Sequence, residues 1–341
     1  MNLSPKLIDE SSLREWFDAQ GLGQGKEISF ERVKAGESNE VFIVKRSNDF
    51  WVLRRPSLVP LSFDGSNRIM EREFRFQSAL EGTKVPHAKA ISLCTDISVT
   101  GSFFYVMEWV DGLVPSDPIP EELGGMDSYH DIAIQLLKAL GELASIDYQS
   151  AGLSDLGRPE GFLERQVGRW KGQLDSYQNR EIPGIDEVAE WLEDNRPKKT
   201  IPGVMHGDYN FHNMLFSKEK NPRLLAVLDW ENATIGDPLM DLGYLMGTLN
   251  FENKNMPDRS QAVSLWADRA GIKPESLGWY VVMSKFKLAC MLEGVYVRQV
   301  EDTTRKTTPF LGEMVVSLID QAIQFIPEAS DWYKSDLKNN K

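Results

Sequence analysis

Two carboxylates and one amide near the middle of the chain have the types and the spacing to act on one substrate. Asp208 precedes Asn213 by five positions, and Asp229 follows further along the chain. Residues 214–216 and 224–228 are apolar, and the polar, turn-rich segment between them predicts an antiparallel hairpin. Folding about that turn would bring Asn213, at the start of one strand, beside Asp229, at the end of the other.

The chemistry that this arrangement predicts is phosphoryl transfer. Amide and carboxylate oxygens are ligands that Mg²⁺ accepts, with water and substrate phosphates completing its shell. Asp208 lies on the loop before the hairpin, at the D-x-x-x-x-N spacing with which kinases place a proton-accepting Asp before a metal-binding Asn. Such a transfer needs charge neutralisation and in-line placement rather than covalent chemistry. We therefore predict that Asp208 is the catalytic residue, which positions a substrate hydroxyl, and that Asn213 and Asp229 bind the Mg²⁺ that accompanies ATP.

The stretch around Asp208 resembles the Brenner-type motif of the aminoglycoside phosphotransferase and choline kinase-like family. His206-Gly207-Asp208 begins the family's H-G-D-x-x-x-x-N, and residues 236–242 reproduce its G-D-P-x-x-D-L. The resemblance implies a bilobal protein-kinase-like fold of the α+β class, with an N-lobe of antiparallel sheet plus one helix. The C-lobe would be mainly helical and carry the catalytic β-hairpin, and ATP and Mg²⁺ would bind between the lobes.

Further motifs narrow the resemblance and extend it to about residues 27–250. The runs V-L-R-R-P, E-R-E-F and G-S-F-F-Y-V-M-E are similar to kinase-like domains found fused to acyl-CoA dehydrogenases. By the same resemblance, Asp241 would support the catalytic loop from a helix without touching the substrate. We expect His206 to brace that loop through hydrogen bonds rather than to titrate in the reaction.

The N-terminal half is expected to bind the phosphates of the nucleotide. By resemblance, Arg54 occupies the strand position of the phosphate-binding Lys, where a guanidinium could make a planar, bidentate contact. Glu73 on the next helix is its expected partner, in preference to Glu71. The loop 34–39 lies between two predicted strands, and its backbone N–H groups could bind phosphate. The expected cofactor-binding residues of this loop are Gly36, Ser38 and Asn39. A plain hairpin turn, and an ordinary surface ion pair between Arg54 and Glu73, are the alternatives.

Apolar periodicity predicts a change from mainly β to mainly helical structure after the fifth strand. The expected strands are residues 28–33, 41–45, 51–55, 90–94 and 103–109. The expected helices are residues 12–20, 68–80, 129–145, 162–177 and 185–195, with more from 241 to about 325. We expect an N-lobe of residues 1–107 that binds nucleotide phosphates, a hinge of residues 108–112, and a C-lobe of residues 113–341 that carries the catalytic loop, metal ligands and acceptor site. The backbone of the hinge strand, at Met107, Glu108 and Trp109, would contact adenine.

Composition limits the partners. A net charge of −13 disfavours nucleic acid and anionic membranes, which attract clustered Lys and Arg. The chain begins without a secretory signal pattern and contains no apolar run of membrane-spanning length. Cys94 and Cys290 form no paired motif, which favours a reducing compartment. We therefore expect a soluble, cytoplasmic protein with a small-molecule partner.

The acceptor alcohol and two rival functions stay open at this stage. The family resemblance suggests an aminoglycoside, whereas the dehydrogenase-fused relatives suggest a hydroxylated metabolite such as a hydroxyacyl-CoA, which we prefer. One rival is a nucleotide-binding pseudokinase that acts as a binding module. The other is a metal-dependent hydrolase that uses His206, Asp208, His212 and Asp229, although the two histidines lack the i, i+4 spacing of helical zinc motifs.

Overall fold

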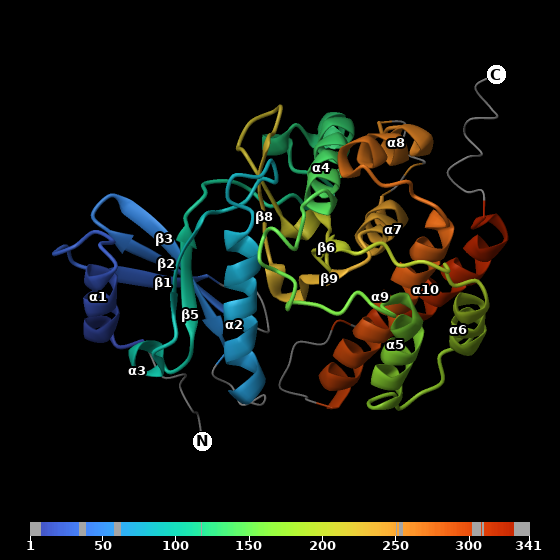
Figure 1. Cartoon of the computed structure of the whole chain (residues 1–341), viewed down its shortest axis with the longest axis horizontal. Coiled ribbons are helices and arrows are strands. Elements are labelled where there is room, and N and C mark those ends of the chain that lie inside the picture. Colours follow the sequence, from blue (N-terminus) through green and yellow to red (C-terminus); the bar gives the residue numbers. More distant parts are fainter. Residues whose placement is uncertain are drawn as a thin grey trace.

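An antiparallel sheet and one long helix form the N-terminal lobe of the structure (Figure 1). This computed structural model describes residues 8–33, 39–57, 63–116, 118–249, 251, 255–301, 308 and 310–330. The sheet has the order β1-β2-β3-β5-β4, with bounds β1 Ser29–Val33, β2 Asn39–Arg46, β3 Asp49–Pro56, β4 Ala90–Cys94 and β5 Phe104–Glu108. The helices of this lobe are α1 Glu10–Ala19, α2 Phe63–Ser78 and α3 Ile97–Thr100.

The two faces of this sheet are covered differently. On one face, Leu13 and Phe17 of α1 pack against Val44, Leu53 and Phe104 in a small apolar core. On the other side, α2 lies between the sheet and the second lobe (Figure 1). The apolar face of α2, which includes Phe76, joins the large core of the second lobe. The helix therefore links the two lobes and can place its polar residues at their junction.

The second lobe is mainly helical. Its helices are α4 Tyr129–Ala144, α5 Gln166–Asp175, α6 Ile185–Asp194, α7 Leu239–Thr248, α8 Arg259–Ala270, α9 Leu277–Glu301 and α10 Leu311–Phe325. Short 3-10 turns are η1 Glu121–Leu123, η2 Gly125–Ser128, η3 Leu163–Arg165, η4 Phe211–Asn213, η5 Trp230–Asn232 and η6 Ile326–Glu328. No described helix combines the length and the apolar character that crossing a membrane would require.

Two small antiparallel ladders lie within this helical lobe. Strand β7 (Met214–Phe216) pairs with β8 (Leu224–Val227), as the sequence predicts, and β6 (Gly203–Met205) pairs with β9 (Thr234–Gly236). The hairpin also contacts the chain that leaves β5, because Leu113 and Phe216 exchange two backbone hydrogen bonds of 2.8 Å. A Cβ at Gly112 would lie 2.6 Å from the Phe216 carbonyl oxygen, so this close approach requires glycine.

The predicted bilobal α+β fold is confirmed, and the differences lie at helix starts. Helix α1 begins at Glu10 rather than at residue 12, because the Asp9 carboxylate accepts from the Ser12 N–H at 2.8 Å and acts as the N-cap. Helix α2 begins at Phe63, five residues before the predicted start. The strands keep their predicted places to within two residues, because short runs of strand-forming residues bounded by turn-forming residues are a local signal.

Candidate active site

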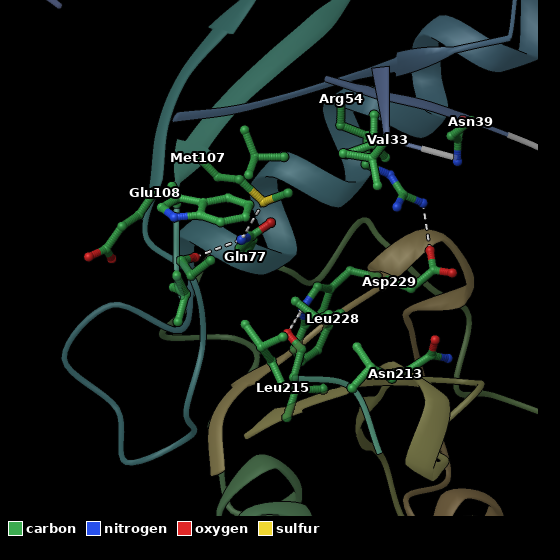
Figure 2. A pocket seen from close by; sticks show the side chains of 18 of the residues that line it. Val33, Asn39, Arg54, Gln77, Met107, Glu108, Asn213, Leu215, Leu228 and Asp229 are labelled. Carbon is green, nitrogen blue, oxygen red and sulfur yellow. Dashed lines mark hydrogen bonds and ion pairs between the residues drawn. The ribbon is translucent and has the colours of Figure 1, made fainter. Parts of the chain in front are cut away.

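A cavity of about 590 Å³ lies between the two lobes (Figure 2). Apolar side chains line it from both lobes, including Val41 and Val52 from the sheet and Leu215 and Leu228 from the hairpin region. The end of β5 and the residue after it border the same cavity through the three residues predicted to contact adenine, Met107, Glu108 and Trp109. Apolar walls on two sides, with a strand end at the rim, suit a flat ring that hydrogen-bonds along one edge.

The β7–β8 hairpin places Asn213 and Asp229 at the edge of this cavity (Figure 2). They are neighbours because the Leu228 N–H donates to the Asn213 carbonyl oxygen at 2.8 Å. Asp229 has a φ of 66°, a left-handed conformation that is costly for a residue with a Cβ. The ladder that precedes it and the 3-10 turn that follows it hold this conformation in place.

Asp208 lies within hydrogen-bond distance of the same amide. The Asn213 Nδ2 donates to the Asp208 carboxylate and to the Asp208 carbonyl oxygen, each at 2.9 Å. Because the nitrogen of Asn213 is engaged, its Oδ1 is the atom left to accept, and no described donor uses it. Asn210 donates to the other Asp208 carboxylate oxygen at 2.8 Å. These two amides fix the orientation of a half-buried carboxylate.

The loop before Asp208 is fixed by buried groups. Asp241 accepts from the backbone N–H groups of His206 at 2.6 Å and Gly207 at 2.9 Å. The His206 Nε2 lies 2.8 Å from the Leu228 carbonyl oxygen, and its Nδ1 accepts from the Asp208 N–H. Gly207 has a φ of 84°, and a Cβ there would lie 2.4 Å from a backbone oxygen, so only glycine fits. His206 and Asp241 thus connect the backbone before Asp208 to the hairpin and to α7.

Asp241→Asn should lower the free energy of unfolding by roughly 2–4 kcal/mol, because it removes one acceptor from two buried N–H donors. The donors would face an amide that can accept at only one oxygen. Urea denaturation followed by circular dichroism would measure the change. The matched control is Asp268→Asn, an exposed carboxylate on α8, which should change stability by less than about 0.5 kcal/mol. Equal effects of the two substitutions would contradict the bracing role.

On the opposite side of the cavity, Arg54 connects both lobes. Its Nε lies 2.8 Å from a Glu73 carboxylate oxygen, and its Nη2 lies 2.5 Å from an Asp229 oxygen, the contact drawn in Figure 2. The expected partner Glu73 is therefore paired, whereas Glu71 is exposed. Both Arg54 and Glu73 are largely buried, with side-chain exposures of 11% and 0%. The surface-pair alternative is excluded by that burial.

The charges around Arg54 are unbalanced. Besides Glu73 and Asp229, Glu231 lies 3.5 Å from the same guanidinium. Burial alone would lower the pKa of Arg54, but the surrounding carboxylates raise it well above its usual value. Burial raises the pKa of Glu231, and the neighbouring Asp229 charge adds to that increase. One cation among three carboxylates leaves an excess of negative charge that a divalent cation would neutralise.

The donor set at the hairpin fits Mg²⁺ better than a transition metal. Asn213 Oδ1 and the Asp229 carboxylate are hard oxygen donors, which Mg²⁺ takes together with phosphate oxygens. Among the described residues, no group of three His, Cys, Asp or Glu side chains is arranged to hold a metal ion. The described part of the chain therefore offers no protein-only metal cage of the kind that the hydrolase alternative needs.

Several contacts at the site were not predicted from the sequence. The Asn39 Nδ2 donates to Glu231 at 2.8 Å, and the Tyr105 hydroxyl donates to Glu73 at 3.0 Å. Tyr244 of α7 lies within electrostatic range of Asp208, and burial, together with the Asp208 charge, raises the pKa of its hydroxyl. These residues lie in ordinary helical and strand patterns, so the sequence contains no signal for them. The predicted phosphate-loop residues Gly36 and Ser38 lie outside the described residues, whereas Asn39 lines the cavity.

Two lobes, a cavity between them and an Asp-Asn-Asp set at its edge define the kinase-like class of phosphotransferase folds. The profile of the Phosphotransferase enzyme family matches residues 29–274. The chain therefore belongs to the phosphotransferase enzyme family, which confirms the predicted enzyme class.

Individual relatives agree with this membership. Acyl-CoA dehydrogenase family member 11 of Pongo abelii is 31% identical over 334 residues, which cover 91% of this chain and 42% of the relative. The chain thus spans less than half the length of the acyl-CoA dehydrogenase family member 11 proteins that it matches. A crystal structure from Ralstonia eutropha, provisionally described as an aminoglycoside phosphotransferase, has a TM-score of 0.80 at 30% identity and covers 94% of this chain and 99% of its own. An aminoglycoside phosphotransferase in complex with ADP and hygromycin B has a TM-score of 0.59 at 13% identity, covers 92% of this chain and 98% of its own, and shares the fold.

Proposed function

We propose that this chain is an ATP-dependent small-molecule kinase that transfers the γ-phosphate to a substrate hydroxyl. The observation that carries the proposal is the convergence of Asp208, Asn213 and Asp229. Asn213 and Asp229 line the interlobe cavity, and Asn213 donates a hydrogen bond to Asp208 beside it. The spacing of the residues, their shared hydrogen bonds and their place beside a cavity are independent of one another. A turn or a helix cap would account for one of these features but not for all three.

Each residue of the set has a distinct part in the transfer. Asp208 accepts a hydrogen bond from the acceptor alcohol and takes up its proton as the alcohol oxygen bonds to the γ-phosphorus. The bond from that phosphorus to the bridging oxygen breaks at the same time, and ADP leaves. Asn213 and Asp229 would hold Mg²⁺, which neutralises charge on the phosphates. Arg54 turns from Asp229 toward the phosphates while Glu73 keeps its guanidinium in place. The positions of Asp208, Asn213 and Asp229 are set before the substrate binds, which lowers the entropic cost of reaching the transition state.

The cofactor contacts follow from the same placement. We propose that the strand end at Met107, Glu108 and Trp109 binds adenine, and that Asn39 with Gly36 and Ser38 binds phosphate. This corresponds to a division into an N-lobe of residues 1–107, a hinge of residues 108–112 and a C-lobe of residues 113–341. ADP and an ATP analogue are present in structures that share this fold, which supports an adenine nucleotide as the cofactor.

For the acceptor, the relatives favour a metabolite over an antibiotic. The curated relatives that match most of this chain are acyl-CoA dehydrogenase family members, whose names refer to acyl-CoA chemistry. A hydroxyacyl-CoA or a related hydroxylated metabolite therefore becomes the preferred acceptor. The aminoglycoside alternative rests on the provisionally described structure from Ralstonia eutropha and on more distant neighbours.

A screen of hydroxylated metabolites with γ-labelled ATP and Mg²⁺ tests the function. We expect label transfer to at least one alcohol, and no transfer when the alcohol is replaced by its deoxy analogue. Thermal unfolding with ATP and Mg²⁺ should be run in parallel. An increase in melting temperature without transfer to any acceptor, hydroxyacyl-CoA and aminoglycosides included, would contradict catalysis and favour a nucleotide-binding module.

A further inference from the structure

Two cationic side chains lie over one tryptophan beside the catalytic loop, and a third, from another helix, contacts the segment that follows Asp229. Lys287 of α9 donates from its Nζ to the Gly207 carbonyl oxygen at 2.6 Å and lies 5.5 Å from the Trp170 ring centroid. Arg169 of α5 lies over the same ring at 5.1 Å. Arg72 of α2 donates from its Nε to the Ala233 carbonyl oxygen at 2.9 Å, on the segment that follows Asp229. We call Arg72, Arg169 and Lys287 the cationic trio.

The members of the trio act on one another electrostatically. Burial lowers the pKa of Arg72, and the charge of Arg169 lowers it further. Burial also lowers the pKa of Lys287, with Asp241 and Asp208 opposing the change and Arg169 adding to it. Arg169 therefore lies within electrostatic range of both partners, and Lys287 lies within range of Asp208. The trio extends from the predicted catalytic carboxylate toward α2 and α5.

No described carboxylate forms an ion pair with any member of the trio. Other buried or half-buried arginines of this chain are paired: Arg54 with Glu73, Arg75 with Asp155, and Arg180 with Glu293. In a chain of net charge −13, three neighbouring cations without a paired carboxylate are unexpected. Arg72 and Lys287 are half-buried, and Arg169 is exposed beside them. Like charges repel one another, so the arrangement costs stability unless an anion binds it.

The trio retains hydrogen-bond donors for a ligand. Arg169 makes no hydrogen bond within the described residues, so its guanidinium donors are available. Lys287 has three N–H donors, of which the Gly207 carbonyl uses one. The Trp170 Nε1–H, buried between these cations, also lacks an acceptor among the described residues. None of the three cations lines the interlobe cavity, so they are separate from the proposed nucleotide contacts.

We propose that the acceptor alcohol carries an anionic group, a phosphate or a carboxylate, which Arg72, Arg169 and Lys287 bind next to the catalytic loop. The inference rests on the proposed kinase function and specifies its substrate class. An anion there would pair with the cations and leave the hydroxyl of the same molecule within reach of Asp208. A polycationic aminoglycoside would meet three like charges at the same place. The cationic trio thus favours an anionic acceptor, even though the protein as a whole carries a net negative charge.

Anion binding can be measured without any catalysis. Isothermal titration calorimetry with inorganic phosphate would be run on enzyme saturated with Mg²⁺ and ADP, so that the nucleotide cavity is filled. We expect Arg169→Gln to weaken phosphate binding roughly tenfold, the effect of losing one or two charge-assisted hydrogen bonds. Arg14→Gln removes the same charge from an exposed position on α1, and it should leave the affinity within about twofold. Equal affinity of wild type and Arg169→Gln, or no binding by wild type, would overturn the proposal.

Matched acceptors separate this inference from the kinase proposal. Transfer from γ-labelled ATP would be compared for glycerol 3-phosphate and glycerol, and for 3-hydroxybutyrate and 3-hydroxybutyramide. We expect kcat/KM to favour one anionic member at least about tenfold, and the preference to shrink in Arg169→Gln. The pair of acceptors that shows this preference tells whether the enzyme binds a phosphate or a carboxylate. If the enzyme phosphorylates neutral alcohols or kanamycin, and Arg169→Gln does not change the rate, the proposal of an anionic acceptor is wrong. The proposal of kinase activity would then still stand. Arg169-dependent phosphate binding without any transfer would support the anion site and refute the kinase.

Discussion

Asp208→Asn lowers kcat for phosphate transfer by roughly 10²–10⁴ if this carboxylate positions the acceptor alcohol. The amide keeps the size of the side chain but cannot take up a proton. It also presents an N–H where the Asp208 oxygens accept from Asn210 and Asn213 at 2.8 and 2.9 Å. Nucleotide affinity should stay close to that of wild type, because the cavity does not include Asp208. Steady-state kinetics together with calorimetric binding of ATP and Mg²⁺ would measure both quantities.

Two comparisons make this result specific. Asp268→Asn, an exposed carboxylate on α8, should keep wild-type turnover and controls for general effects of removing a charge. Equal melting temperatures of wild type and Asp208→Asn would exclude unfolding as the cause of lost activity. Turnover in Asp208→Asn that matches wild type would remove Asp208 from the mechanism.

Asp229→Ala should weaken the apparent affinity for Mg²⁺ in the presence of ATP by at least roughly tenfold, the scale of losses at metal sites. The substitution removes a carboxylate ligand and also frees Arg54, whose Nη2 lies 2.5 Å from Asp229. ATP binding without Mg²⁺ should change much less, because apolar residues form most of the cavity wall. Titration of Mg²⁺ at fixed ATP, followed by calorimetry, would separate the two effects.

Glu231→Gln is the matched control for that experiment. Glu231 belongs to the same acidic group and lies 3.5 Å from Arg54, but Asn39 already donates to it at 2.8 Å. If Asp229 is a ligand, Asp229→Ala should impair Mg²⁺ binding much more than Glu231→Gln. Similar losses in both variants would mean that the general negative charge, rather than a particular ligand, attracts the metal.

The hairpin and its polar residues could be predicted because the determining signals are local. Two short apolar runs, a turn-rich connection and a fixed spacing from Asp208 to Asn213 all lie within one short segment. The same holds for β4, whose observed bounds match the predicted ones. The placement of Arg54 against Glu73 came instead from family resemblance, since nothing local relates a strand residue to a helix residue further along the chain.

Contacts between distant segments could not be predicted. Asp229 pairs with Arg54, which lies 175 positions earlier, and Lys287 reaches Gly207 across 80 positions. Neither interaction leaves a trace in periodicity or turn chemistry, because each depends on how complete elements pack. The start of α1 was predicted wrongly for a local reason. Asp9 and Ser12 are both residue types that favour the N-cap position, and in the structure the earlier residue, Asp9, is the N-cap.

The most direct test is a crystal structure of the protein with Mg²⁺ and a non-hydrolysable ATP analogue. We predict the metal at about 2.1 Å from both the Asn213 Oδ1 and an Asp229 carboxylate oxygen, the distance typical of Mg²⁺. Arg54 should have moved from Asp229 to the phosphates, and Asp208 should face the γ-phosphate with room for an alcohol between them. A metal bound without either hairpin residue, or a γ-phosphate remote from Asp208, would contradict the proposed mechanism.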